Sequence, residues 1–284
     1  MIVRRHEGAI IGVVLSLRVG CEFVWESAVP TACVVQVEPR RDMGYEFARE
    51  EWTTEPDIDS RHYGDTHGNR CRRLTLGAGP TTVRYDTYVT TSGAIDAADD
   101  AAPEVPPAEL PDETLMFTLP SRFCQSDVLG DEAWDRFGSI PPGYRRVAAI
   151  NDFVHHHLTW EAGATIPSTT ALDVYQSGRG VCRDFAHLAI SFCRALNIPA
   201  RYVFGYLPDI DVPPPSEPMD FCAWTEVYLG DRWYTFDPRN NARRIGRILI
   251  GRGRDAVDVA MFTTFGGPEL VTMQVWADPA ESSP

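Results

Sequence analysis

The sequence predicts an α+β fold, in which an N-terminal all-β part precedes a part that combines helices with an antiparallel sheet. Short alternating and β-branched runs fill residues 14–92. Residues 142–158 and 182–196 carry apolar side chains at helical spacing. Strand-like runs separated by turn residues return after residue 200. The cysteine-bearing helix at 182–196 is therefore expected to pack on the sheet that follows it.

Composition excludes several classes of function. The chain has 284 residues, enough for one large or two ordinary domains, and 44% of them are hydrophobic. The formal net charge of −14 argues against nucleic-acid binding, which needs a basic surface. All 26 residues counted as lysine or arginine are arginine, so Schiff-base and lysine-base chemistry are excluded.

Cysteine usage favours a cytoplasmic, reducing compartment. Seven scattered cysteines form no CxxC pair, and an odd number fits free thiols. The basic start and the apolar residues 9–17 imitate a signal peptide, but Arg18 interrupts the apolar run and no small-residue cleavage site follows. An extended start leading into a first strand is favoured. No run reaches the roughly 18 apolar residues of a membrane span, so no membrane partner is expected.

The all-β part is expected to form a β-sandwich over residues 14–93. His67-Gly-Asn-Arg70 has the composition of a hairpin turn. Several short strands at this spacing are typical of a small sandwich. The expected strands are 15–25, 31–38, 71–76 and 81–90.

An acidic, proline-rich linker is expected over residues 94–111. Asp96 to Glu113 contains many acidic residues and no basic ones, and four prolines interrupt it. Such composition favours a solvated connection with little core of its own; an interaction arm is the alternative.

Residues 112–284 are expected to form the second domain. Gly230-Asp231 predicts a two-residue hairpin. Helical patterns cover 131–137, 142–158 and 168–175, and strand patterns cover 200–207, 221–229, 232–237, 247–250 and 270–276.

Cys182 is the leading nucleophile candidate from its local sequence. Gly178 and Gly180 precede it and predict a tight loop, after which the helix should end near Asn197 because Pro199 follows. Cys182 would then stand at a helix N-terminus, where unpaired N–H groups and the helix dipole favour a thiolate. The apolar stripe of this helix is Phe185, Leu188, Ala189, Phe192 and Leu196.

Four motifs in order make the chain resemble the transglutaminase-like cysteine peptidase superfamily, in particular bacterial members with an N-terminal β-domain. They are Gly-Val-Cys182-Arg-Asp-Phe-Ala-His, Ile198-Pro-Ala-Arg-Tyr-Val, Ala223-Trp-Thr-Glu-Val-Tyr228 and Trp233-Tyr-Thr-Phe-Asp237-Pro. The resemblance implies a transglutaminase/papain-like domain in which Cys182 is the nucleophile and Asp237 orients a base. The family's base is a histidine just before the Ala-Trp pair, and Cys222 occupies that position.

Cys222 leaves three interpretations open. It can be inert, which would make the chain a pseudoenzyme. It can form a disulfide with Cys182 as a redox switch, which needs Cβ atoms about 3.5–4.5 Å apart. It can be a weaker partner in altered thiol chemistry. The two thiols and Asp237 could also supply three ligands to a zinc ion, but this is a weak candidate site, and no cofactor or metal is expected. Without an imidazole, Asp237 is expected to pair with Arg239 or to cap the strand end.

The seven histidines all lie at or before residue 187, so none can replace the missing base on the later strands. His187 follows Cys182 by five positions and should face away from the thiol as a packing residue. His155, His156 and His157 point about 100° apart on a helix and cannot share one metal ion. They are expected on a solvated helix face.

The function implied by the resemblance is acyl chemistry on peptide or amide bonds through a Cys182 thioester. Hydrolysis of a peptide or protein substrate is favoured over cross-linking, because nothing marks an amine-acceptor site. The alternative is a catalytically degenerate protein that binds peptides or proteins without turnover, since loss of a general base typically costs roughly 10²–10⁴ in rate. The oligomeric state is not set by the sequence.

Overall fold

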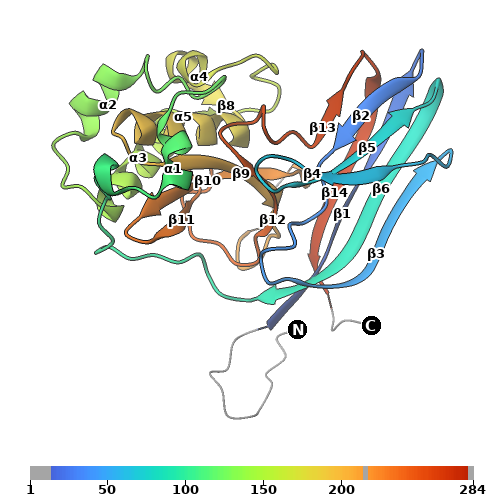
Figure 1. Ribbon diagram of the computed structural model, residues 1–284, viewed down its shortest axis with the longest axis horizontal. Coiled ribbons are helices and arrows are strands. Elements are labelled where there is room, and N and C mark those ends of the chain that lie inside the picture. Colours follow the sequence, from blue (N-terminus) through green and yellow to red (C-terminus); the bar gives the residue numbers. More distant parts are fainter. Residues whose placement is uncertain (1–13, 214–216, 281–284) are drawn as a thin grey trace, which may run out of the picture.

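The structure, a computed structural model, describes residues 14–213 and 217–280 (Figure 1). It has the α+β class that the sequence predicts, with a β region beside a region in which helices pack on an antiparallel sheet. The expected extended start before residue 14 lies outside the described residues. Every helix in the described ranges is too short or too polar to serve as a bilayer-spanning segment.

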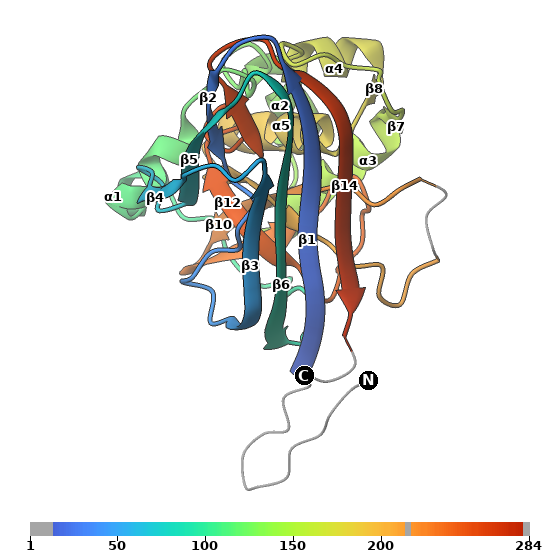
Figure 2. The ribbon, with the colours of Figure 1, turned by 90° about the vertical axis from the view of Figure 1, so that its right-hand side faces the viewer.

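The β region consists of two four-stranded antiparallel sheets that share a hydrophobic core. β1 (Val14–Ser27) alternates, and its inward residues Leu17, Val19 and Phe23 are fully buried. The first sheet, seen face-on in Figure 2, has the order β14 (Glu269–Pro279), β1, β6 (Gly79–Ser92), β3 (Glu46–Glu55). The second has the order β13 (Phe262–Thr264), β2 (Thr31–Val35), β5 (Arg70–Leu76), β4 (Arg61–Gly64).

Strands β13 and β14 return to the β region, although they belong to the segment that we expected in the second domain. β14 pairs antiparallel with β1, and β13 pairs with β2. Gly20 explains part of this fit, because a Cβ there would lie 2.5 Å from the indole ring of Trp276 on β14. Val275 and Ala277, on the inward face of β14, are buried. The chain therefore leaves the β region after β6 and re-enters it near residue 262.

The acidic segment 94–111 is fastened to the helical region and is not a freely solvated connection. The carbonyls of Ala102 and Pro103 accept hydrogen bonds from Tyr144 N and Gly230 N at 2.9 and 2.8 Å. Glu104 accepts from Gly143 N at 2.9 Å and contacts Arg146 at 3.3 Å. The short helices η1 (Pro107–Glu109), α1 (Asp112–Leu115) and η2 (Met116–Thr118) follow.

The helical region is built around α5 (Cys182–Ala195), which packs on a four-stranded antiparallel sheet as expected. Phe185, Leu188 and Phe192 are buried along the predicted apolar stripe. Asn197, the expected helix end, adopts φ of 62° just beyond the last turn. The sheet order is β11 (Arg232–Phe236), β10 (Cys222–Leu229), β9 (Ala200–Tyr206), β12 (Ile248–Gly253). The other elements are α2 (Gly130–Phe137), α3 (Tyr144–His157), α4 (Ala171–Ser177) and the parallel pair β7 (Thr159–Trp160) and β8 (Arg179–Gly180).

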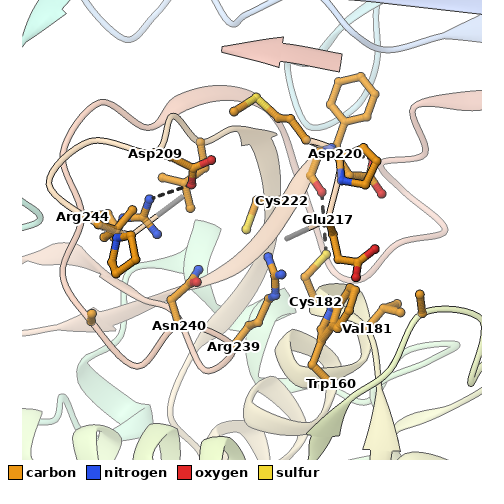
Figure 3. Close-up of a pocket in the computed structure, with 18 of the residues that line it drawn as sticks. Trp160, Val181, Cys182, Asp209, Glu217, Asp220, Cys222, Arg239, Asn240 and Arg244 are labelled. Carbon is orange, nitrogen blue, oxygen red and sulfur yellow. Dashed lines mark hydrogen bonds and ion pairs between the residues drawn. The ribbon is translucent and has the colours of Figure 1, made fainter. Parts of the chain in front are cut away.

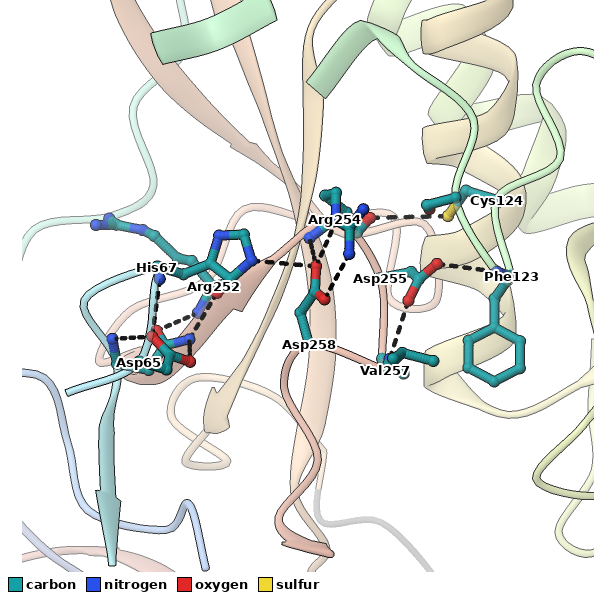
Figure 4. Close-up of polar contacts among 12 residues, drawn as sticks. Asp65, His67, Phe123, Cys124, Arg252, Arg254, Asp255, Val257 and Asp258 are labelled. Carbon is teal, nitrogen blue, oxygen red and sulfur yellow. Dashed lines mark hydrogen bonds and ion pairs between the residues drawn. The ribbon is translucent and has the colours of Figure 1, made fainter. Parts of the chain in front are cut away.

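Polar contacts lock the two regions together at the loops after β4 and β12 (Figure 4). Asn69 exchanges two hydrogen bonds with the backbone of Arg252, at 2.7 and 2.9 Å. His67 contacts Asp258 at 3.2 Å, with both side chains 11% exposed. On the far side of the same loop, buried Asp255 accepts from Phe123 N at 2.9 Å. The sheet that carries the site is thus fixed on the β region.

Candidate active site

Cys182 is the first residue of α5, where the sequence predicts it. α4 ends at Ser177 and is capped by Gly178, whose φ of 69° reverses the chain, and Arg179 and Gly180 then pair with β7. A Cβ at Gly180 would lie 2.8 Å from the Cβ of Asp184, so only glycine fits this turn. The two glycines therefore deliver Cys182 from a tight loop directly into the helix.

Asp184 fixes the first turn of α5. Its carboxylate is fully buried and accepts hydrogen bonds from Val181 N at 2.9 Å and Thr165 Oγ1 at 2.6 Å. Arg183 Nε donates to its other oxygen at 3.1 Å. An acidic group at this position also suits the helix dipole. These contacts hold the backbone that carries the Cys182 thiol.

The half-buried Cys182 lines a cavity of about 450 Å³ between α5, the start of β10 and the loop before it (Figure 3). Cys182 Sγ lies 3.8 Å from the carbonyl oxygen of Phe221. A cavity of this size is in the range of small-molecule and peptide side-chain sites. Its other labelled lining residues are Trp160, Val181, Asp209, Glu217, Asp220, Cys222, Arg239, Asn240 and Arg244.

Cys222 begins β10 and lines the same cavity, so the structure brings the two sequence-predicted cysteines together. Donation from the Cys222 thiol lowers the pKa of Cys182, and the Ala223 N–H acts in the same direction, whereas burial opposes them. The same contact, together with burial, raises the pKa of Cys222 well above its ordinary value. Both cysteines are free thiols, so the disulfide alternative is not formed. The contact therefore makes Cys182 the more readily ionised thiol of the pair, and Cys222 the less readily ionised one.

Asp237 follows β11 and is 3% exposed. The expected pairing with Arg239 is wrong, because the carboxylate contacts Arg247 Nη2 at 2.8 Å. The expected capping role is present, since Asp237 accepts from Asn240 N at 2.9 Å and from Asn240 Nδ2 at 2.8 Å. Arg247 therefore balances the charge of the Asp237 carboxylate, and Arg247 and Asn240 hold it in place of an imidazole.

Arg247 links this carboxylate to the acidic segment. Its Nε donates to Asp96 at 2.9 Å, and its guanidinium lies 4.8 Å from the ring centroid of Trp224. The Arg247 side chain is only 7% exposed. Sequence reasoning missed this Asp96–Arg247–Asp237 chain, because no motif connects three residues so far apart.

Arg239 lies in the cavity, with its guanidinium 5.0 Å from the ring centroid of Trp160. Its charge contributes to the lowered pKa of Cys182. The sequence signal was its position directly after the Asp237-Pro motif, but sequence reasoning assigned it only as a partner of Asp237. It is instead a cationic wall of the candidate site.

Two of the three consecutive histidines on α3 contact backbone carbonyls and so help to hold neighbouring segments. His155 Nδ1 contacts the carbonyls of Pro238 and Arg239 at 3.2 and 3.0 Å, and His157 Nε2 contacts the carbonyl of Tyr175 at 2.8 Å. Only His156 is exposed as expected of a solvated face. Within residues 14–213 and 217–280, no group of three histidine, cysteine or acidic side chains is arranged to hold a metal ion, so the zinc alternative finds no support there.

His187 is fully buried and packs against Phe123 and Tyr202. Its Nε2 accepts a hydrogen bond from Ala256 N at 3.1 Å. Burial lowers the pKa of His187 to about 3. It is a neutral packing residue, as expected, and it is absent from the cavity lining.

Comparisons with known proteins agree with this geometry. The sequence profile of the transglutaminase-like superfamily matches residues 135–238. The crystal structure of a candidate cysteine protease from Cytophaga hutchinsonii is 31% identical and superposes with a TM-score of 0.85, over 95% of this chain and 92% of that chain. The chain therefore belongs to the transglutaminase-like superfamily, as its four motifs predicted.

Two curated relatives are mycobacterial proteins described as uncharacterized. ML0607 of Mycobacterium leprae is 36% identical over 120 residues, which are 41% of this chain and 42% of that protein. Rv2569c of Mycobacterium tuberculosis is 32% identical over 180 residues, which are 60% of this chain and 56% of that protein. The chain thus spans about half the length of the curated relatives it matches.

Proposed function

We propose that this chain performs cysteine-dependent acyl chemistry on peptide or amide bonds, with Cys182 as the nucleophile and a peptide or protein as substrate. The observation that carries the proposal is the lowered pKa of a half-buried thiol at the start of α5, inside a cavity of about 450 Å³. The N–H groups of Cys182 and Arg183 at the start of α5 have no intrahelical acceptor and can stabilise an oxyanion, whereas those of Asp184 and Phe185 donate to the Val181 carbonyl. We expect hydrolysis rather than cross-linking.

In the proposed chemical step, Cys182 is the nucleophile and Cys222 is the nearest candidate proton donor. The Cys182 thiolate attacks the carbonyl carbon, the C–S bond forms, the C–N bond breaks, and the amine leaves with a proton. Cys222 is a poor source of that proton because its pKa is raised. Water therefore supplies the proton, and a second water hydrolyses the thioester to release the acid and restore Cys182. Without an imidazole this turnover is slow.

A specific observation favours the alternative of a binding protein without turnover. Asp237 is engaged by Arg247 and Asn240, and the position of the base holds a cysteine with a raised pKa. Such a site could keep the substrate groove after the proton-transfer machinery is lost.

Replacing Cys222 with histidine separates the two functions. We expect Cys222→His to raise hydrolysis of a peptide anilide by roughly 10²–10⁴ over wild type, because an imidazole restores general acid–base catalysis. Cys182→Ala is the matched control and should abolish activity in both backgrounds. Peptide mass spectrometry after incubation with an activated peptide ester should detect an acyl group on Cys182 in wild type.

The outcomes are distinct. An acyl adduct on wild-type Cys182 that never turns over would support the binding protein. Absence of an adduct in both wild type and Cys222→His would remove Cys182 as the nucleophile.

We also propose a cytoplasmic location. It is supported by the state of the cysteines, since all seven are free thiols and six of them are buried. Buried unpaired thiols are typical of a reducing compartment.

A further inference from the structure

Arg239 is a charged cavity residue to which the proposed chemistry gives no role beyond its effect on the pKa of Cys182. Its guanidinium stacks near Trp160, and within residues 14–213 and 217–280 its side chain makes no ion pair or hydrogen bond (Figure 3). The neighbouring cavity arginine, Arg244, is engaged by the carbonyl of Pro208 at 2.9 Å and by Asp209 at 3.5 Å. A guanidinium facing a cavity without a protein acceptor retains unused hydrogen-bond donors.

The backbone of Arg239 is held firmly at the cavity wall. His155 Nδ1 contacts its carbonyl at 3.0 Å. The turn is closed by Asn240 N on the Asp237 carboxylate at 2.9 Å and by Asn241 N on the Asp237 carbonyl at 2.7 Å. Contacts from α3 and from Asp237, which follows β11, thus fix the backbone from which this cation enters the cavity.

The charges around the cavity favour one kind of ligand for Arg239. The net charge of −14 makes the protein as a whole repel anions, so an anionic ligand can be held only where a local cation such as Arg239 offsets that repulsion. Glu217 and Asp220, both exposed, line the same cavity and the charge of Arg239 acts on Asp220, so an anionic ligand is favoured only on the side of Arg239 that faces away from these two carboxylates. Arginine binds carboxylates through a planar, bidentate geometry that few other side chains provide.

We infer that Arg239 binds a carboxylate of the substrate, so that the preferred substrates are acyl compounds with a carboxylate close to the carbonyl that Cys182 attacks. A peptide whose free C-terminus lies next to the reacting bond has this chemistry. The inference rests on the proposed function, because it assigns specificity to the same cavity and the same nucleophile.

Alkylation by two reagents of similar size tests the inference without the natural substrate. Iodoacetate carries a carboxylate and iodoacetamide does not. With either reagent the Cys182 thiolate forms a C–S bond while the C–I bond breaks and iodide leaves with the bonding electrons. The ratio of the two rates cancels the thiolate fraction, and its change from wild type to a variant reports the attraction of the carboxylate that the variant has lost.

The comparison uses wild type, Arg239→Gln and, as a matched control, Arg243→Gln. Arg243 is exposed on the same loop and does not line the cavity. The rates are read from the Cys182 peptide by mass spectrometry. We expect the iodoacetate-to-iodoacetamide ratio to fall roughly five- to tenfold in Arg239→Gln, the value of a partly screened charge-assisted hydrogen bond. The ratio should be unchanged in Arg243→Gln.

The experiment distinguishes failure of the carboxylate site from failure of the proposed function. Equal ratios in all three proteins, with Cys182 still reactive, would overturn the carboxylate site and leave the nucleophile intact. Equal slowing of both reagents in Arg239→Gln would also overturn it, since Arg239 would then act only on the ionisation of Cys182. If neither reagent labels Cys182 in any of the proteins, the proposed function itself fails.

Discussion

At the scale of single residues, the exchange of a histidine for Cys222 is visible in the sequence, but its electrostatic consequences are not. The motifs located Cys182, Cys222 and Asp237, and the structure brings both cysteines into one cavity. The partner of Asp237 could not be predicted, because Arg247 reaches it from the start of another strand and is itself held by Asp96. Ion pairs between distant segments leave no periodicity in a sequence.

His187 gives a prediction at this scale. Because Nε2 accepts from Ala256 N, the proton lies on the buried Nδ1. Burial holds the folded-state pKa at about 3; the charge of Asp184 opposes this shift, and those of Arg183 and Arg194 add to it. As the pH falls below about 6.5, the unfolded chain binds a proton here and the folded chain does not, so folding stability is lost. The loss is about 2 kcal/mol between pH 7 and pH 5.

His187→Gln keeps an acceptor for Ala256 N and cannot titrate. Urea unfolding at pH 7, 6 and 5 should therefore show a smaller decrease of the free energy of unfolding in His187→Gln than in wild type. His156→Gln, at an exposed position of α3, should behave as wild type. Parallel pH dependences for wild type and His187→Gln would contradict the neutral, buried state of His187.

At the scale of elements, the cysteine helix was predicted well because its signals are local. Glycines before it, an apolar stripe within it and a proline after it fixed its type and limits. The helix also receives support that its own sequence does not contain, since Thr165 and the β7–β8 pair hold its first turn. Trp160 entered the site by this route, and no local pattern pointed to it.

Asp184 gives the prediction for this element. Asp184→Ala removes the acceptor of Val181 N and of Thr165 and leaves Arg183 without its ion pair. We expect the free energy of unfolding to decrease by about 3 kcal/mol, the cost of breaking a buried, hydrogen-bonded charge pair. Chemical denaturation followed by circular dichroism measures it.

Asp131→Ala is the matched control, because Asp131 is also an acidic residue in the first turn of a helix but is exposed. Its cost should stay below about 1 kcal/mol. Equal costs for the two variants would mean that only the helix dipole matters at Asp184.

At the scale of the whole molecule, the strands were predictable but their partners were not. Alternation marked residues 270–276 as a strand, yet alternation defines a buried face and not a neighbour. The pairing of β14 with β1 joins segments at opposite ends of the described chain. Dividing the chain into two domains by sequence order therefore missed that β14 pairs with β1. For the same reason it missed that residues 94–111 are hydrogen-bonded to the helical region.

Truncation tests how much the molecule depends on this return. A chain ending at Gly267 lacks β14, exposes one edge of β1 and loses the burial of Val275 and Ala277. We expect most of it in the insoluble fraction after expression, because an unpaired, apolar-faced strand edge promotes aggregation. A chain ending at Ala280 should remain soluble with cooperative thermal unfolding. A soluble, cooperatively unfolding protein that ends at Gly267 would show that β14 is dispensable.

The β1–β14 pairing also sets an order of events during translation. β1 is made first and β14 follows only after the helical region and its sheet have been synthesised. At roughly 5–20 residues per second, β1 waits tens of seconds on the ribosome for its partner. All strands around Cys182 are complete before that moment. The nascent chain can therefore shape its reactive cavity while one edge of β1 still lacks its partner and is open to chaperones.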